Sequence, residues 1–164
     1  MEGLILNERT EYVTYLEPIF DAVGRDYISR LNWRITYPEV GGSATDCYSF
    51  EGNVDSWIFG KELLEEIDNH PDLQWWWGLL QGFEQNISQT EAMKEAPIDI
   101  QEDTEIWSNP VTMRNPEASI EIEAFDSSMT VVIVKEKAVL EKLKAAFPDH
   151  ELLSEYNEKG EPAK

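Results

Sequence analysis

The sequence predicts an α+β fold in a single domain, with a mainly antiparallel sheet and helices packed on one face. The main observation is the order of patterns between residues 119 and 147, where a strand, a hairpin turn, a second strand and an amphipathic helix follow one another. The second observation is composition, because 41% of the 164 residues are hydrophobic. That proportion is enough for one packed core, despite a formal net charge of −20.

The first part of the chain predicts a helix and a strand. Apolar residues recur at helical spacing over residues 12–23, and Gly24 supplies a C-terminal stop. Pro18 interrupts this segment, so either the helix kinks there or a shorter helix begins at the proline. Residues 33–37 alternate between apolar and polar, which indicates a strand with one buried face that ends at Pro38.

The middle part predicts a loop up to residue 53, a helix over residues 61–69 and a strand over residues 73–83. His70 is expected to cap the helix, since the following Pro71 pushes the residue before it out of the helical region. The strand assignment depends on its aromatic content, which is typical of β-structure.

Three consecutive tryptophans lie in this aromatic strand. Alternation places Trp75 and Trp77 on one face and Trp76 on the other, and Gly78 marks a bulge or a close backbone approach. We expect most of this aromatic area to be core. The alternatives are a partly exposed Trp76 at an interface, or stacking on a sugar or a base.

The remainder divides into an irregular and a regular part. Residues 86–118 are polar and contain three prolines, with a brief strand expected at 111–114. Residues 119–125 alternate, as in a strand with one exposed face, whereas residues 129–134 are apolar throughout, which is typical of a strand covered on both faces. Residues 136–147 then predict an amphipathic helix.

The negative charge is concentrated in one region. Between residues 38 and 126 there are 20 acidic and three basic residues, which gives −17, whereas the rest of the chain sums to −3. A charge of this sign repels phosphate and excludes a nucleic-acid partner on bulk electrostatics. A surface that mixes charges of both signs limits self-repulsion, so this asymmetry indicates an acidic surface that meets a cationic partner.

The candidate partner-binding residues are acidic, with one aromatic anchor. They are Asp99, Glu102, Asp103, Glu105, Trp107, Glu121, Glu123 and Asp126. Glu121 and Glu123 are two residues apart on one expected strand, so their side chains should stand side by side on its open face. The alternative is an ordinary solvated loop beside a polar strand face, with Trp107 in the core.

Catalysis and metal binding find little support in the sequence. The two histidines, His70 and His150, are expected to be structural or incidental, and Cys47 has no basic residue close by to lower its pKa. Residues 99–105 lack the spacing and the central glycine of a calcium loop. We therefore expect no catalytic residue, no metal and no cofactor.

Three segments of the C-terminal half resemble small acidic bacterial proteins. They are Asp99-Ile-Gln-Glu-Asp, Ile106-Trp-Ser-Asn-Pro, and Ile120-Glu-Ile-Glu-Ala-Phe-Asp-Ser-Ser running into the apolar strand. Some of these proteins are similar in size and acidity to immunity proteins of secreted and polymorphic toxin systems. The resemblance covers residues 99–147. It implies a non-enzymatic inhibitor that covers a toxin's active site or a cationic surface beside it.

These observations predict an immunity-type inhibitor, with a general acidic adaptor for some other basic protein as the alternative. A small carboxylate- or metal-dependent enzyme is the least favoured class. We expect a domain over residues 1–157, a flexible tail over 158–164 and a monomer when the partner is absent. No apolar run reaches the ~18 residues of a membrane span, and the N-terminus lacks a signal-peptide pattern, which predicts a cytoplasmic protein.

Overall fold

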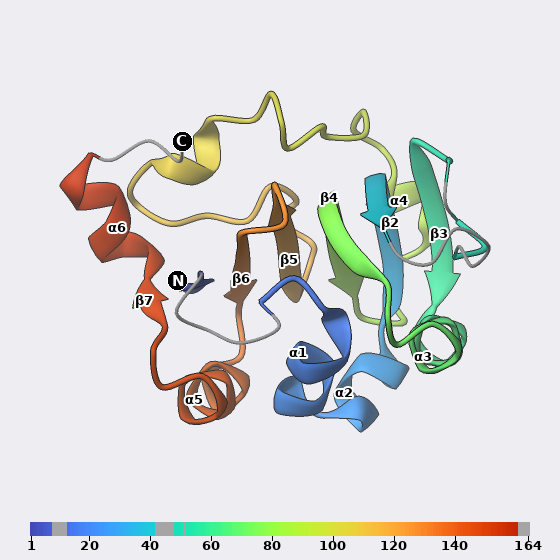
Figure 1. Cartoon of the computed structure of the whole chain (residues 1–164). Helices are drawn as coiled ribbons and strands as arrows, with labels where there is room; N and C mark the ends of the chain where they lie inside the picture. Colours follow the sequence, from blue (N-terminus) through green and yellow to red (C-terminus); the bar gives the residue numbers. More distant parts are fainter. Residues whose placement is uncertain (8–12, 42–47, 51, 161–164) are drawn as a thin grey trace.

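The computed structural model describes residues 1–7, 13–41, 48–50 and 52–160 of the chain. Its centre is an antiparallel sheet with the strand order β3-β2-β4-β5-β6-β1-β7 (Figure 1). The strands are β1 (Glu2–Leu6), β2 (Asn32–Gly41), β3 (Asp55–Phe59), β4 (Gln74–Phe83), β5 (Ile120–Phe125), β6 (Met129–Val134) and β7 (Glu151–Leu152). The predicted α+β class with an antiparallel sheet is confirmed.

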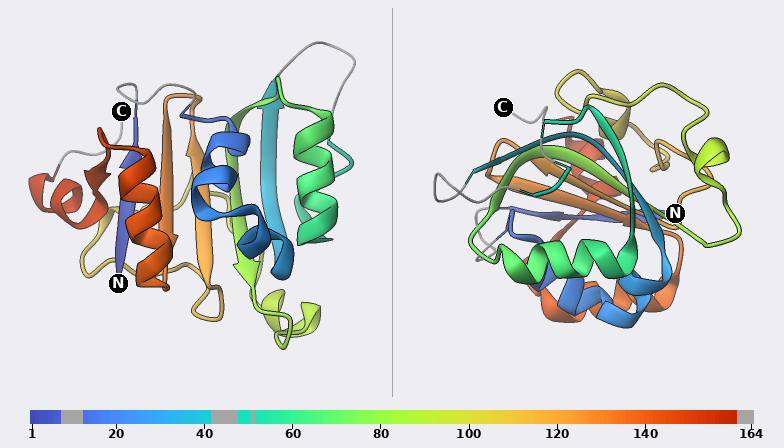
Figure 2. Two further views of the ribbon diagram at one scale, coloured as in Figure 1. Left: turned by 90° about the horizontal axis from the view of Figure 1, so that it is seen from below. Right: turned by 90° about the vertical axis from the view of Figure 1, so that its right-hand side faces the viewer.

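Four helices cover one face of the sheet, which is the lower face in Figure 1. They are α1 (Leu16–Val23), α2 (Arg25–Arg30), α3 (Gly60–Asn69) and α5 (Lys137–Ala146). Along this layer α1 packs against α5 and α2 packs against α3. Figure 2 shows the helices and the sheet as two separate layers. None of the helices in the described part of the chain has both the length and the apolar character of a membrane span.

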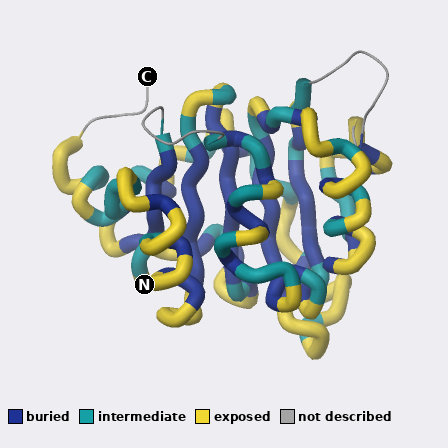
Figure 3. The backbone as a smooth tube through the Cα atoms, turned by 60° about the horizontal axis from the view of Figure 1, so that its bottom comes forward, coloured by how far each residue is buried: buried dark blue, intermediate teal, exposed yellow. Residues whose placement is uncertain are grey.

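The opposite face of the sheet is covered by residues 84–119, here called the cover segment, together with α6 (Leu153–Lys159). Apart from α4 (Gln89–Ala92) and the 3-10 helix η1 (Glu105–Trp107), the cover segment has no regular structure. Its apolar residues pack against the sheet in a second core, which is separate from the core beneath the helices. Both faces of the central strands are therefore buried (Figure 3).

A buried arginine attaches the cover segment to the sheet. Arg34 of β2 forms a bidentate ion pair with Asp55 of β3, with both N–O distances at 2.9 Å. Its guanidinium also donates to the carbonyl oxygens of Ala92 and Glu95 at 3.1 and 3.0 Å. These bonds satisfy a guanidinium that is almost completely buried, and they fix the start of the cover segment across β2.

Most of the strongly patterned elements are where the sequence predicts them: α3, β4, β5, β6, α5 and the turn after β5. α1 begins at Leu16, so Pro18 lies in its first turn, where the missing N–H costs nothing. A short helix thus forms without a kink at the proline, but it begins at Leu16 and not at Pro18 as expected. β2 continues past Pro38 to Gly41, with an irregular register opposite β4.

The sequence patterns miss several elements of the fold and predict one that does not form. β1, β3, α2 and α6 were not predicted, and the expected strand at 111–114 does not form. Helix α6 extends to Lys159, which includes the first two residues of the expected tail, and residues 161–164 lie outside the described residues, as does Cys47.

The tryptophans of β4 depart from simple alternation. Trp75 lies in the helix-side core, whereas Trp77 packs on the opposite face against Phe125. Gly78 lies between them and the rest of the strand with φ 148°, and a Cβ at this position would be 2.8 Å from the Trp75 ring. The prediction of a shared face is wrong because the register shifts here: the adjacent residues Glu39 and Val40 of β2 lie opposite Trp77 and Trp75, which are two residues apart. Trp76 is 45% exposed, as the interface alternative requires.

Candidate functional site

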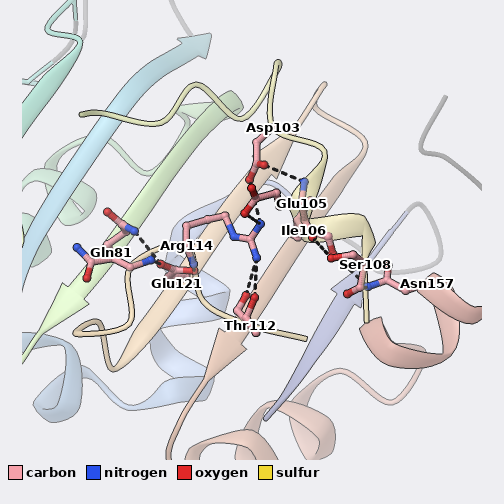
Figure 4. Close-up of polar contacts among 10 residues, drawn as sticks. Gln81, Asp103, Glu105, Ile106, Ser108, Thr112, Arg114, Glu121 and Asn157 are labelled. Atoms are coloured by element: carbon pink, nitrogen blue, oxygen red, sulfur yellow. Dashed lines mark hydrogen bonds and ion pairs between the residues drawn. The ribbon is translucent and has the colours of Figure 1, made fainter. Parts of the chain in front are cut away.

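The acidic residues of the cover segment help to hold that segment together. The Arg114 side chain is 3% exposed, and its guanidinium lies 3.5 Å from a carboxylate oxygen of Asp103 and 3.6 Å from one of Glu105. The same group donates to the carbonyl and hydroxyl oxygens of Thr112 at 2.9 and 3.0 Å (Figure 4). The two carboxylates thus balance a cation that is almost completely buried.

Two aspartates shape turns in the same segment. The Asp99 carboxylate accepts a hydrogen bond from the N–H of Gln101 at 3.0 Å, and the Asp103 carboxylate accepts one from the N–H of Glu105 at 2.9 Å. Side-chain bonds to the backbone two residues on are a local device for fixing turns. The predicted acidic residues that remain exposed are Glu102, Glu105 and Asp126.

Glu121 and Glu123 are completely buried, so the prediction of an open acidic face on β5 is wrong. Both side chains enter the second core, because the cover segment crosses this face of the strand. Glu121 accepts hydrogen bonds from Nε2 of Gln81 at 2.7 Å and from the backbone N–H groups of Arg114 and Asn115 at 2.8 and 2.9 Å. Burial raises the pKa of Glu121, and these hydrogen bonds oppose the rise.

The carboxyl group of Glu123 has no hydrogen-bond partner among the described residues. Its register partners on the neighbouring strands are Leu79 and Val131, both fully buried. Burial raises the pKa of Glu123 well above its usual range, and the nearby Glu121 carboxylate adds to the rise. A carboxyl group in such surroundings is held in its neutral form. Neither Glu121 nor Glu123 is accessible to a partner protein in this fold.

Trp107 is half-buried in the second core. Its ring centroid lies 5.2 Å from that of Phe125 and 5.6 Å from that of Tyr156 on α6. These contacts correspond to the alternative in which Trp107 belongs to the core. Its role as an anchor for a partner stays a prediction.

A groove with a different composition lies between α3 and the edge of the sheet at β3. Its volume is about 540 Å³. It is lined by Ser49, Phe50, Asn53, Ser56, Trp57, Ile58, Glu62, Glu65, Glu66, Asn69 and His70. Two consecutive elements thus form its walls: strand β3 with the residues that precede it, and helix α3, which begins directly after β3. We call this site the α3–β3 groove.

One wall of the groove is an acidic stripe along α3. Glu62, Glu65, Glu66 and Asn69 follow the i, i+3, i+4, i+7 spacing of a single helix face. The opposite side of the helix buries Leu63 and Ile67 in the core. Like charges three and four residues apart destabilise a helix by about 0.2–0.5 kcal/mol per pair, so this stripe lowers the stability of α3. Glu62 has a partly compensating role, because its carboxylate accepts from the N–H of Phe59 at 3.4 Å.

The opposite wall is aromatic. Phe50 stacks on Tyr48 with a centroid distance of 4.9 Å, and the half-buried Trp57 packs on Phe83 at 5.8 Å. Two apolar side chains beside the groove, Val54 and Phe59, are each 56% exposed. The site therefore offers a partner both apolar area and negative charge.

His70 caps α3, as predicted, and lies in the lining of the groove. Its Nε2 is 3.9 Å from the Glu66 carboxylate, which also accepts the N–H of Ser49 at 3.2 Å. Its Nδ1 is buried and has no hydrogen-bond partner among the described residues. In the described part of the chain, no three histidine, cysteine or acidic side chains converge as a metal site would require.

Within the described part of the chain, no lysine or arginine lines the α3–β3 groove. Two further cavities, of about 380 and 410 Å³, differ in this respect, since Lys94 lines the first and Arg25, Arg30 and Lys142 line the second. Carboxylates without local counter-charges in a concave site favour a cationic ligand.

The groove was not predicted from the sequence. The acidic stripe is visible in the spacing of residues 62, 65 and 66, but β3 has no strong strand pattern and the groove needs both walls. No protein-family model, no curated protein and no solved structure matches this chain.

Proposed function

We propose that this chain is a non-enzymatic, acidic protein-binding domain whose partner is a basic protein, and that the α3–β3 groove is its binding site. The observation that carries the proposal is the composition of the groove. Three glutamates on one helix face stand opposite a wall that contains Phe50 and Trp57, and among the described residues no lysine or arginine lines the space between them.

The whole surface supports such a role. Among the described residues, 20 acidic but only seven basic side chains are exposed. An excess of one sign accelerates encounter with an oppositely charged protein and fixes its orientation. The half-buried Trp57 in the lining, and the exposed Val54 and Phe59 on the same stretch of chain, supply apolar area whose desolvation slows dissociation.

The more specific form of the proposal is an immunity-type inhibitor that occupies a basic toxin surface or active site. Its support is the resemblance of residues 99–147 and the match between an acidic groove and the basic clefts of toxins that cleave nucleic acid. A general acidic adaptor is the alternative within the same class. The two differ in the number of partners that they bind.

The test is a capture experiment with two matched charge reversals. Glu65→Lys changes an exposed glutamate in the middle of the ten-residue helix α3, at the groove. Glu141→Lys makes the same change in the middle of the ten-residue helix α5, away from it. Tagged wild-type protein and both variants are incubated with host lysate, washed at low and then high salt, and the retained proteins are identified by mass spectrometry.

We expect one basic protein to resist the high-salt wash on the wild type and on Glu141→Lys. Its retention by Glu65→Lys should fall about tenfold or more, because a like charge now faces the cationic partner. If both variants retain the basic protein equally, the groove is not its binding site. A broad set of basic proteins that is lost at high salt from all three would show only non-specific attraction, and would contradict a dedicated partner.

A further inference from the structure

Strand β3 is an edge of the sheet, and of its N–H groups that of Phe59 already donates to Glu62 at 3.4 Å. It pairs with β2 over residues 55–59, and within the described residues no strand lies on its other side. The opposite edge is blunted, since β7 is only two residues long and leads directly into α6. Proteins usually protect long edges with lysine, proline or a bulge, because unpaired backbone groups recruit further strands. The β3 sequence, Asp55-Ser-Trp-Ile-Phe, has none of these.

We infer that the basic partner inserts an extended segment into the α3–β3 groove, where it pairs with β3 as an additional strand. This inference rests on the proposed function and names the recognition mode at the same site. Strand addition supplies affinity through backbone hydrogen bonds, whereas specificity comes from alternate side chains.

The two faces of β3 define the pattern of that segment. Ile58 packs into the helix-side core, on the face where the groove carries its glutamates. Trp57 packs into the second core, and Phe59, two residues on, shares its face and is 56% exposed. Alternate side chains of an added strand therefore meet acidic groups on one face and aromatic groups on the other. The fitting segment alternates lysine or arginine with an apolar residue over about five positions.

Charge excludes a second copy of this chain as the occupant. Two molecules paired through β3 would each bring Glu62, Glu65 and Glu66 to the junction, and each carries a formal charge of −20. Like charges brought together in this way oppose association. A cationic segment of a basic partner brings no such repulsion, because it carries charge opposite to that of the glutamates.

The test uses a capped peptide of alternating lysine and valine and the full chain at low salt. Two further peptides carry N-methyl groups on every second residue, one in each register. Methylation removes one row of N–H donors and keeps the charge and the side chains. Binding is measured by titration, and amide hydrogen exchange of residues 55–59 is followed with and without each peptide.

We expect the unmethylated peptide to slow exchange at β3, and methylation in one register to weaken binding about tenfold or more. Glu65→Lys should weaken it too, whereas Glu141→Lys should not. Equal binding of all three peptides, or binding without protection of β3, would overturn strand addition. Such a result would leave the acidic groove in place, because the capture experiment tests the groove independently. Failure of the unmethylated peptide to bind would also overturn the inference.

Discussion

At the scale of single residues, some charged side chains of this protein form buried ion pairs, and others lie exposed on the surface. Arg114 and Arg34 are buried cations that hold the cover segment, and the acidic groups that face them are used inside the fold. Sequence composition alone does not separate these carboxylates from those on the surface. Asp103 looks like the exposed Glu102 in the sequence, yet only tertiary structure brings the buried Arg114 to it.

Glu123 gives the clearest prediction at this scale. Burial raises the pKa of Glu123 well above its usual range, so the folded state favours the protonated carboxyl group. Protonation of Glu123 therefore stabilises the folded protein. This stabilisation is complete at pH values below the pKa of Glu123 in the unfolded chain, and it is lost as the pH rises through its pKa in the folded protein. Between the two values each pH unit removes about 1.4 kcal/mol of stability. Glu123→Leu should therefore increase the free energy of unfolding at pH 8 by about 1–3 kcal/mol and flatten its pH dependence.

Denaturant unfolding at pH 5 and pH 8 measures this effect. Glu141→Leu is the control, because Glu141 is exposed on α5 and the substitution should leave the pH dependence unchanged. The free energy of unfolding of Glu123→Leu should still depend weakly on pH, since burial also raises the pKa of Glu121. A Glu123→Leu variant with the wild-type slope, or one that is less stable at pH 8, would show that the carboxyl group is solvated or paired in solution.

At the scale of elements, the sequence predicts regular periodic segments well and fails where burial is aperiodic. Helix α5 and strand β6 have patterns that survive in the fold. Strand β5 also forms, but its alternation was interpreted as one exposed face. A signal against that interpretation was present, because its neighbour β6 is apolar on both faces and a sheet covered over one strand is covered over the next.

The cover segment could not be predicted for the same reason. Its buried residues Ile100, Ile106, Val111 and Met113 occur without a helical or strand period, so local patterns do not distinguish it from an exposed loop. Its attachment depends on long-range contacts, such as the Thr36 hydroxyl, which donates to the carbonyl of Ile98 at 2.8 Å. The missed strand β3 is equally non-local, since it is short and its register depends on β2.

Gly78 gives a prediction at the element scale. Its φ of 148° is one that residues with a side chain rarely adopt, and a Cβ would be 2.8 Å from the Trp75 ring and 3.3 Å from Cα of Pro38. Gly78→Ala should therefore destabilise the protein by about 2–4 kcal/mol, measured by denaturant unfolding. Gly160→Ala is the control, because Gly160 has φ 65° but open space around it. This substitution should lower the free energy of unfolding by only about 1 kcal/mol. If Gly78→Ala and Gly160→Ala lower the free energy of unfolding equally, the close approach to Trp75 is not the reason why residue 78 is a glycine.

At the scale of the whole molecule, the sequence asymmetry of charge becomes a difference between regions of the surface. The acidic region of residues 38–126 forms β3, α3, β4, β5 and the cover segment, whereas lysines lie around α5. The sequence predicts an acidic partner-binding surface centred on residues 99–126, and that role stays a prediction. Part of that stretch is buried by the cover segment, and the described acidic groove lies at the other end of the acidic region, on α3.

The final prediction follows from this surface and concerns the rate of association with the captured partner. Screening shortens the range of electrostatic attraction from ~30 Å at 0.01 M salt to ~8 Å at physiological ionic strength, so the association rate should fall about tenfold or more over this interval. Glu65→Lys should lower the association rate at low salt and flatten its salt dependence. Phe59→Ala leaves the charge unchanged and should chiefly increase the dissociation rate, because Phe59 is exposed apolar area beside the groove.

Stopped-flow or surface-based kinetics over a salt series separates the two rates, and Glu141→Lys controls for the change in net charge. If Glu65→Lys and Glu141→Lys lower the association rate equally, steering arises from the total charge and the position of the groove has no kinetic role. If instead the rate is independent of salt in the wild type, the acidic surface does not guide encounter. Only a local effect of residue 65, combined with an effect of Phe59→Ala on dissociation, is consistent with a partner that is attracted by the carboxylates and held at the edge of the sheet.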